Sequence, residues 1–283
     1  MHRDIVARCE LSLQQALVSK DFIPHAHRGF ISELYAPKDD SNIRQGERVF
    51  YTTRNANFLD IARQCIEGLP ENVRHFFIAP LLSQASVHAN TSGVFKGFYK
   101  NSSTGIGQFG GNNRDALSRI MADITLPFPV FSRFSSDVTV LRQDALEAAG
   151  LVPEIDLAYL DPPYNQHPYG SNYFMLNLIA DYLRPTKTSR VSGIPHGWQR
   201  SAYNRRQDVA LELGRLVQKI KAKYLLVSYN SEGYVSFREM GELLASAGSV
   251  EVLTTQYNTF RGSRNLRGRS IHVHEYLFLV KTR

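Results

Sequence analysis

The tetrapeptide Asp161-Pro162-Pro163-Tyr164 is the part of this sequence whose residue types say most about chemistry. A carboxylate and a proline carbonyl are two hydrogen-bond acceptors, and proline fixes its own φ angle and has no N–H to compete for them. Two acceptors at a set separation suit an exocyclic amine, and the tyrosine ring offers a flat face for a planar heterocycle. The tetrapeptide predicts a pocket for an amino-bearing base, although Asp and Pro are also common turn residues and a plain turn remains an alternative.

The position of the tetrapeptide favours a site over a plain turn. Residues 155–160 form a short apolar run directly before it, and such a run is typical of a buried parallel strand. Ligands of open α/β sheets bind beyond the carboxyl ends of these strands. Asp161 is therefore expected at the ligand-binding end of a sheet.

The stretch 161–173, with the strand before it, resembles motif IV of the Dam-like, α-ordered DNA N6-adenine methyltransferases. Other segments resemble that family in the same order: ERVFYT at 47–52, NTSGVF at 90–95, QDA at 143–145, LVSYN at 226–230, and 257–269 followed by EYL at 275–277. The resemblance covers most of the chain. It implies a site-specific enzyme that moves a methyl group from S-adenosylmethionine to N6 of a flipped-out adenine, as the modification arm of a restriction–modification system.

The same resemblance implies an α/β fold, a Rossmann-like S-adenosylmethionine-dependent methyltransferase core with an inserted, mostly helical and loop DNA-recognition region. Residues 1–24 are expected to be a helix remaining from the N-terminal part of the core, 25–113 the DNA target-recognition region, and 114–283 the catalytic core. Apolar periodicity predicts strands at 138–141, 155–160, 224–228, 250–257 and 273–280, and helices near 2–20, 57–68, 114–124, 173–182, 204–221 and 237–247. This alternation predicts a largely parallel sheet with an antiparallel hairpin at its C-terminal edge.

One element of the family does not occur in this sequence. Members begin with a Lys/Gly-containing segment and a Phe-x-Gly-x-Gly turn after the first strand, which cradles the methionine end of S-adenosylmethionine. Glycines there let backbone amides approach the ligand. The glycine-rich run 105–111 follows a polar stretch instead of a strand, and 260–264 leaves too few residues after it for a helix and further strands. We therefore expect the first strand and glycine turn to be missing, and an upstream segment or an N-terminal partner chain to supply them.

The expected reaction gives each motif residue a role. The N6 lone pair of adenine is delocalised into the ring, so the amine is a poor nucleophile. Asp161 accepting one N6 hydrogen and the Pro162 carbonyl accepting the other would stabilise the charge that develops on the nitrogen, and Tyr164 would stack on the flipped-out base. Pro163 completes the catalytic set. Cofactor contacts are expected from Asp144, Asp161 and Tyr164; a helix N-cap is the alternative role of Asp144.

Contacts with double-stranded DNA are expected from three regions. Residues 84–113 mix aromatic, small polar and basic side chains, which is typical of a nucleic-acid surface, although the aromatic rings could instead pin this loop to its own domain. A second region follows the motif, and a third is the basic run near the C-terminus, for which a phosphate clamp and a solvated turn are both open. The expected DNA-binding residues are Asn90, Phe95, Lys96, Lys100, Tyr169, Asn172, Arg261, Arg264 and Arg267.

Composition agrees with a DNA-binding enzyme of the reducing cytoplasm. Lys plus Arg number 33 against 26 Asp plus Glu, which gives a net charge of +7 and favours polyanionic partners. Two cysteines and unpaired histidines predict neither a disulfide framework nor a metal site, and no apolar run has the length of a membrane span. A cognate restriction endonuclease is a further expected partner.

Two other readings of the sequence stay open at this stage. One is a truncated, cofactor-deficient DNA-binding remnant, or one half of a split methyltransferase. The other keeps the enzyme but changes the acceptor to N4 of cytosine, because the motif needs only an exocyclic amine. The order of the segments and the stretch 90–95 resemble the adenine group and disfavour cytosine.

Overall fold

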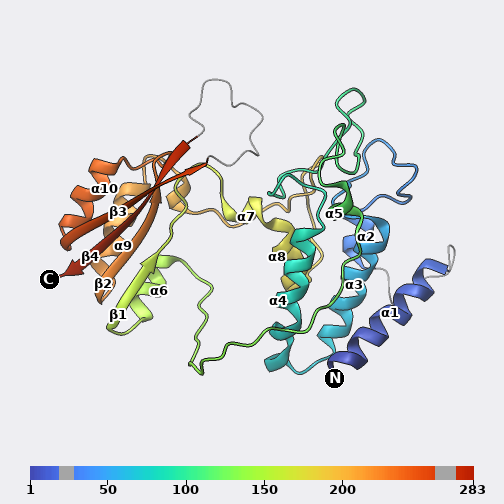
Figure 1. Ribbon diagram of the computed structural model, residues 1–283, viewed down its shortest axis with the longest axis horizontal. Helices are drawn as coiled ribbons and strands as arrows, with labels where there is room; N and C mark the ends of the chain where they lie inside the picture. Colours follow the sequence, from blue (N-terminus) through green and yellow to red (C-terminus); the bar gives the residue numbers. More distant parts are fainter. Residues whose placement is uncertain (19–28, 259–271) are drawn as a thin grey trace. The chain divides into compact units, whose positions relative to one another are not determined.

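The computed structural model describes residues 1–18, 29–258 and 272–283, and Figure 1 traces their helices and strands. The chain forms two compact units. One comprises Met1–Arg133 and Gly170–Trp198, and the other comprises Phe134–Tyr169 and Gln199–Arg283. None of the described helices is both long and apolar enough to cross a membrane.

The first unit is a group of helices packed around buried aromatic rings. Tyr35, Phe50 and Phe174 form its centre, with ring centroids 5.7 to 6.0 Å apart. Thr52 caps the start of the helix at Thr53–Glu67 by accepting a hydrogen bond from the Asn55 N–H. The helices are α1 (His2–Val18), α2 (Phe30–Tyr35), α3 (Thr53–Glu67), α4 (Glu71–Val87), α5 (Leu117–Met121) and α8 (Phe174–Asp181), and the short α7 (Tyr169–Asn172) begins at the last residue of the other unit's first segment.

Two buried charged side chains of α3 tie this helix to its neighbours. The Asp60 carboxylate accepts from the N–H groups of Ile31 and Ser32 at the start of α2. Arg63 is 2% exposed and donates from Nε to the Ile179 carbonyl of α8 at 2.7 Å. The Tyr182 hydroxyl, which follows α8, donates to Asp60 at 2.8 Å. Hydrogen bonds of buried polar groups, together with apolar packing, therefore hold α2 and α8 against α3.

The second unit is built on a four-stranded mixed sheet in the order β1-β2-β4-β3. β1 (Ile155–Leu160) and β2 (Ala222–Asn230) are parallel, whereas β4 (His272–Thr282) runs antiparallel to both β2 and β3 (Gly248–Asn258). The remaining elements are α6 (Ala145–Leu151), the 3-10 helix η2 (Ala202–Asn204), α9 (Val209–Lys219) and α10 (Phe237–Ala245). The predicted α/β class and the antiparallel pair at the C-terminal edge are confirmed. The expectation of a largely parallel sheet is wrong for the described strands, because β1 and β2 are the one parallel pair among them and β4 inserts antiparallel between β2 and β3.

The helices of this unit pack on one face of the sheet. Leu225 and Val227 of β2 and Phe278 and Val280 of β4 are fully buried there and belong to one core with residues of α6, α9 and α10. α10 begins with a capping box. The Ser236 side chain accepts from the Glu239 N–H, and the Glu239 side chain accepts from the Ser236 N–H. The helices predicted at 204–221 and 237–247 form with shorter bounds, as α9 and α10.

Two predicted elements, one in each unit, are wrong. The strand expected at 138–141 does not form, since neither helix nor strand occurs between Ala122 and Asp144. Val138 and Val140 are 78% and 84% exposed. Apolar β-branched residues specify a strand only when a neighbouring strand is there to accept the backbone hydrogen bonds. The helix expected over 114–124 shortens to α5, because Ala116 takes a left-handed φ of 52° directly before it.

Replacing Arg63 by Met should lower the free energy of unfolding by about 2–4 kcal/mol, because the carbonyls of Ile179 and Ala180 lose a charged donor inside the unit. Arg54→Met is the matched control on the same helix, where the 46% exposed Arg54 pairs with Asp123 and should contribute less than about 1 kcal/mol. Urea unfolding followed by circular dichroism measures both. Equal losses in the two variants would contradict a specific role for the buried guanidinium.

Candidate active site

The tetrapeptide follows β1 at its carboxyl end, as predicted. Leu160, the last residue of β1, pairs with Val227, and β2 continues from there to Asn230. The Asp161 side chain is exposed, Pro162 is buried and Tyr164 is half-buried. An exposed carboxylate and a partly exposed ring thus lie together at the carboxyl ends of two parallel strands, where ligands of such sheets bind.

The segment after β2 holds the tetrapeptide in place. The Tyr234 N–H donates to the Tyr164 carbonyl at 2.9 Å, and the Tyr164 ring meets the Tyr229 ring edge-on, with centroids 6.3 Å apart. Tyr229 is 2% exposed, its hydroxyl accepts from the Val235 N–H, and burial raises the pKa of that hydroxyl. The Tyr164 ring is therefore supported along one edge without being enclosed.

Asn230 shapes the same segment. It is 4% exposed, donates from Nδ2 to Glu275 of β4 at 2.5 Å, and accepts at Oδ1 from the Glu232 N–H at 2.8 Å. Asn204 supports the other side of the motif by donating to the Asn165 carbonyl at 2.8 Å. Sequence reasoning included Asn230 in a family-like segment but missed Tyr234 and Asn204, because their contacts join residues far apart in the chain and leave no local pattern.

Asp144 takes the capping role that was the alternative to cofactor binding. Its Oδ1 accepts from the Leu146 N–H at 2.8 Å at the start of α6. The side chain is exposed, so the cap does not exclude a further contact. The cofactor role stays a prediction.

Three of the residues expected to contact DNA, namely Asn90, Phe95 and Asn172, are buried, which counts against a direct contact with DNA. Asn90 is 0% exposed, donates to the carbonyls of Val49 and Gln108, and accepts from the Gly110 N–H. Phe95 is 2% exposed and lies in the helical core with its ring 6.5 Å from that of Phe50. The aromatic and amide groups of the loop pin it to its own unit, which was the alternative interpretation.

The remaining residues expected to bind DNA differ in exposure. Lys100 is half-buried with Nζ 5.1 Å from the centroid of the Phe98 ring. Partial burial lowers the pKa of Lys96. Tyr169 is 48% exposed, whereas Asn172 is 8% exposed and its carbonyl accepts from the Phe95 N–H. Arg261, Arg264 and Arg267 lie outside the described residues.

The described residues fit S-adenosylmethionine only in part. Acceptors and an aromatic ring stand at the sheet's carboxyl end, but a glycine-rich turn following a strand does not occur within 1–18, 29–258 or 272–283. The run Gly105–Gly111 instead forms a turn in the helical unit, closed by the bridge between Lys100 and Gly107 and using positive φ at Gly105, Gly110 and Gly111. The backbone cradle that the amino-acid end of the cofactor requires is therefore not formed by the part of the chain that the structure describes.

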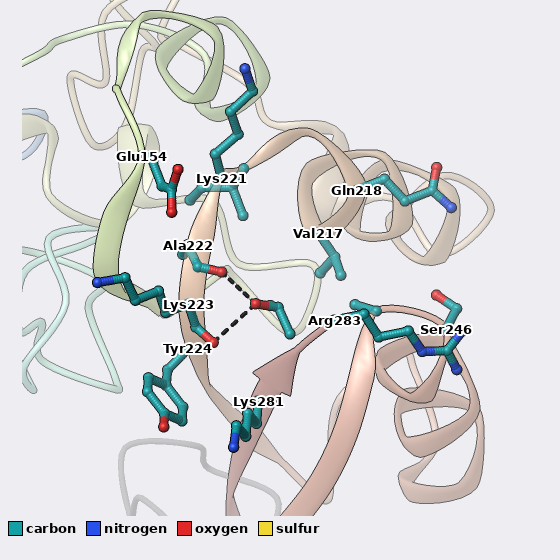
Figure 2. Close-up of a pocket in the computed structure, with 13 residues that line it drawn as sticks. Glu154, Val217, Gln218, Lys221, Ala222, Lys223, Tyr224, Ser246, Lys281 and Arg283 are labelled. Carbon is teal, nitrogen blue, oxygen red and sulfur yellow. Dashed lines mark hydrogen bonds between the residues drawn. The ribbon is translucent and has the colours of Figure 1, made fainter.

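A cavity of about 730 Å³ lies at the amino ends of β1 and β2, opposite the tetrapeptide (Figure 2). The Thr282 hydroxyl donates to the carbonyls of Ala222 and Lys223 within it, and Lys223 pairs with Asp156 at 2.6 Å. Because ligands of parallel strands bind at the carboxyl ends, this cavity is not part of the candidate active site.

Comparisons with known proteins give a consistent result. Residues 18–240 match the model of the D12 class N6 adenine-specific DNA methyltransferases. The chain is 32% identical over 259 residues to the type II methyltransferase M.CviAII of Paramecium bursaria Chlorella virus 1, covering 89% of this chain and 70% of that protein. It is 27% identical over 293 residues to M.NlaIII of Neisseria lactamica, covering 99% and 80%. No solved structure matches the chain significantly.

Asn90→Ala should destabilise the protein by about 2–4 kcal/mol, since three hydrogen bonds inside the unit are lost and the partners stay buried. Asn112→Ala, in the same loop but exposed, is the control and should change stability by less than about 1 kcal/mol. Thermal unfolding of both variants checks this. An Asn90→Ala protein that kept its stability and lost only DNA affinity would favour direct contact.

Proposed function

Since this chain belongs to the family of D12 class N6 adenine-specific DNA methyltransferases, we propose that Asp161, Pro162, Pro163 and Tyr164 form the site that receives a flipped-out adenine. The observation that carries this proposal is the exposed Asp161 carboxylate beside the supported Tyr164 ring at the carboxyl end of β1. We further propose that the enzyme is the modification arm of a restriction–modification system with a cognate endonuclease, as the type II relatives' names suggest.

The chemistry proposed for the tetrapeptide is activation of a weakly nucleophilic amine. Asp161 accepts one N6 hydrogen and the Pro162 carbonyl accepts the other, which draws the nitrogen towards a pyramidal geometry and localises its lone pair. The same acceptors stabilise positive charge on N6, and because they are already in place, little reorganisation is needed. Pro163 fixes the backbone between the acceptors and the ring.

Tyr164 is proposed to hold the base outside the duplex. Extruding a base costs a few kcal/mol, and stacking on an aromatic ring returns about 1–3 kcal/mol per base. The hydrogen bond from Tyr234 holds the backbone carbonyl of Tyr164, and the edge contact with Tyr229 supports its ring before the base arrives. A fixed ring loses little conformational entropy when the base binds.

The family implies S-adenosylmethionine as the methyl donor in general, and we propose that this enzyme uses it on a Rossmann-like core. Asp144, Asp161 and Tyr164 would contact it, and a segment that adds a strand and a glycine turn would complete its site.

DNA contacts are proposed for Lys96, Lys100, Tyr169 and the basic residues Arg261, Arg264 and Arg267. Asn90, Phe95 and Asn172 are proposed to position the recognition loop from within. The recognition region is proposed to span 25–113 and the catalytic core 114–283, with 1–24 contributed by the N-terminal part of the core.

A second candidate function is supported by one observation, the incomplete fit to the cofactor. On this reading the chain binds DNA but needs another polypeptide to hold S-adenosylmethionine. Calorimetric titration of the chain with S-adenosylmethionine separates the two: micromolar affinity favours a self-sufficient enzyme, and absence of binding favours the second candidate. An N4-cytosine acceptor is disfavoured because the matching family model is adenine-specific.

Asp161→Ala should lower the rate of methyl transfer to DNA at least about 1,000-fold while leaving the DNA dissociation constant within about threefold, because the carboxylate acts on the amine and not on phosphates. Asp156→Ala is the matched control, because Asp156 is an exposed carboxylate of β1 near the end opposite to Asp161. Transfer of tritiated methyl groups and a DNA-binding titration give the two readouts. Unchanged methylation by Asp161→Ala would refute the assigned role.

Tyr164→Ala should weaken binding of DNA that carries a flipped base by about 1–3 kcal/mol, which is roughly 5- to 150-fold, whereas Tyr164→Phe should retain the ring and most of the affinity. Fluorescence of 2-aminopurine at the target position reports flipping directly. Equal loss in both variants would point to the hydroxyl instead of stacking.

A further inference from the structure

The segment 187–196 of the helical unit folds into a small hairpin, which we call the 187–196 hairpin. Thr188 and Pro195 form an antiparallel bridge, and the Ser189 N–H donates to the Ile194 carbonyl at 2.8 Å. Ile194 is partly buried against the core of the unit. The hairpin therefore has a defined place on the helical unit.

Two side chains from distant parts of the same unit anchor this hairpin. Tyr35, which ends α2 and is 0% exposed, donates from its hydroxyl to the Gly193 carbonyl at 2.8 Å. Burial raises the pKa of that hydroxyl to about 12, so it remains a donor near neutral pH. Arg48 donates from Nη2 to the Thr188 hydroxyl at 3.2 Å and to the Ser189 carbonyl at 3.1 Å. The backbone is thus held on both sides of the tip.

Gly193 allows the hairpin to lie this close to its anchor. Its φ of 71° is in the left-handed region, and a Cβ added there would lie 2.6 Å from Cε1 of Tyr35 and 2.8 Å from Nε of Arg48. The Arg48 guanidinium carbon is itself 5.7 Å from the centroid of the Tyr35 ring. The hairpin is therefore fixed more firmly than a solvated connection between helices requires.

The exposed side chains of the hairpin suit a polyanionic partner. Lys187, Arg190 and His196 are exposed, and Val191 at the tip is 55% exposed. Residues 182–207 contain six Lys or Arg and no Asp or Glu, whereas the whole chain contains 33 and 26. Because cations are locally in greater excess than in the chain as a whole, the segment favours a phosphate-bearing partner.

The firm anchor favours contact with bases over contact with phosphates alone. Phosphate contacts carry no sequence information, whereas a side chain that reads a base must be held in place by its surroundings. Arginine forms two parallel hydrogen bonds with O6 and N7 of guanine, and an apolar side chain contacts the methyl group of thymine. Arg190 and Val191 are neighbours at the tip and offer these two chemistries. The major groove is about 12 Å wide and admits a two-stranded ribbon.

We propose that the 187–196 hairpin is a base-reading element, in which Arg190 contacts a guanine of the recognition sequence in the major groove and Arg48 and Tyr35 are positioning residues. The inference rests on the proposed function in one respect, that double-stranded DNA is the substrate. Although the hairpin follows the tetrapeptide in the sequence, it belongs to the same compact unit as most of the proposed recognition region 25–113. It adds a second recognition surface to the one proposed for Lys96 and Lys100.

Selection of bound duplexes from a library with a randomised central region tests the role of Arg190. The intact chain should enrich a sequence that contains a guanine, and Arg190→Ala should lose the preference for guanine at one position. The affinity of this variant for the enriched duplex should fall about 5- to 150-fold, because the bidentate contact is lost. Its affinity for a duplex that lacks the enriched sequence should stay within about threefold.

Three further variants separate base reading from general charge and from stability. Lys187→Ala should weaken binding of both duplexes by the same factor, because a phosphate contact does not depend on sequence. Arg238→Ala is the control for loss of an exposed arginine, since Arg238 pairs with Glu242 on α10 in the other unit, and it should change neither affinity. Tyr35→Phe should weaken the same guanine preference at least about threefold. A purely structural role of Tyr35 would lower stability without changing the base preference.

The outcomes are distinct. An Arg190→Ala protein that kept the guanine preference, or lost affinity equally for both duplexes, would overturn the inference, as would an intact chain that enriched no sequence. A Tyr35→Phe protein with an unchanged preference would remove its positioning role. A chain that enriched a sequence but did not methylate it in the presence of S-adenosylmethionine would leave the role of the hairpin standing and count against the proposed function instead.

Discussion

The parallel pairing of β1 with β2 is the constraint on which the candidate site depends. It places the end of β1, where Asp161 begins the motif, beside the end of β2, where Tyr229 and Asn230 lead into the segment that carries Tyr234. The hydrogen bond from Tyr234 to Tyr164 and the contact between the rings of Tyr164 and Tyr229 can form only in that register. The chemistry proposed for the tetrapeptide therefore rests on backbone hydrogen bonds between two strands more than on any single side chain.

In the helical unit, hydrogen bonds of buried polar side chains help to determine how the helices and the loop pack against one another. Asp60 and Arg63 reach from one helix to the backbone of two others, and Asn90 joins three separate backbone segments. A buried polar group that lost its partners would cost about 1–3 kcal/mol, so these contacts select one arrangement among several of similar apolar burial. The loop after α4, residues 88–113, is held by this network, and its aromatic rings are part of the packing.

In the sheet unit, helices cover one face of the sheet, and side chains of the other face are exposed. Its helix face has the dense packing of a finished core, while Leu157, Tyr159 and Leu253 on its other face are 52%, 56% and 71% exposed. The candidate site lies at the end of β1, the strand that carries Leu157 and Tyr159.

The sequence by itself determined the local elements and the motif. Apolar runs and periodicity predicted β1 and α10 close to their observed bounds and predicted β2 and α9 with looser bounds, and the tetrapeptide after an apolar run indicated the position of Asp161 at the end of β1. These features are local, since periodicity and turn chemistry act over a few residues. Tertiary structure alone decided that β4 lies between β2 and β3, that Asn90 and Phe95 are buried, and that Tyr234 and Asn204 support the motif. It also decided that 138–141 stays unpaired, because a strand exists only through a neighbour that the local sequence cannot supply.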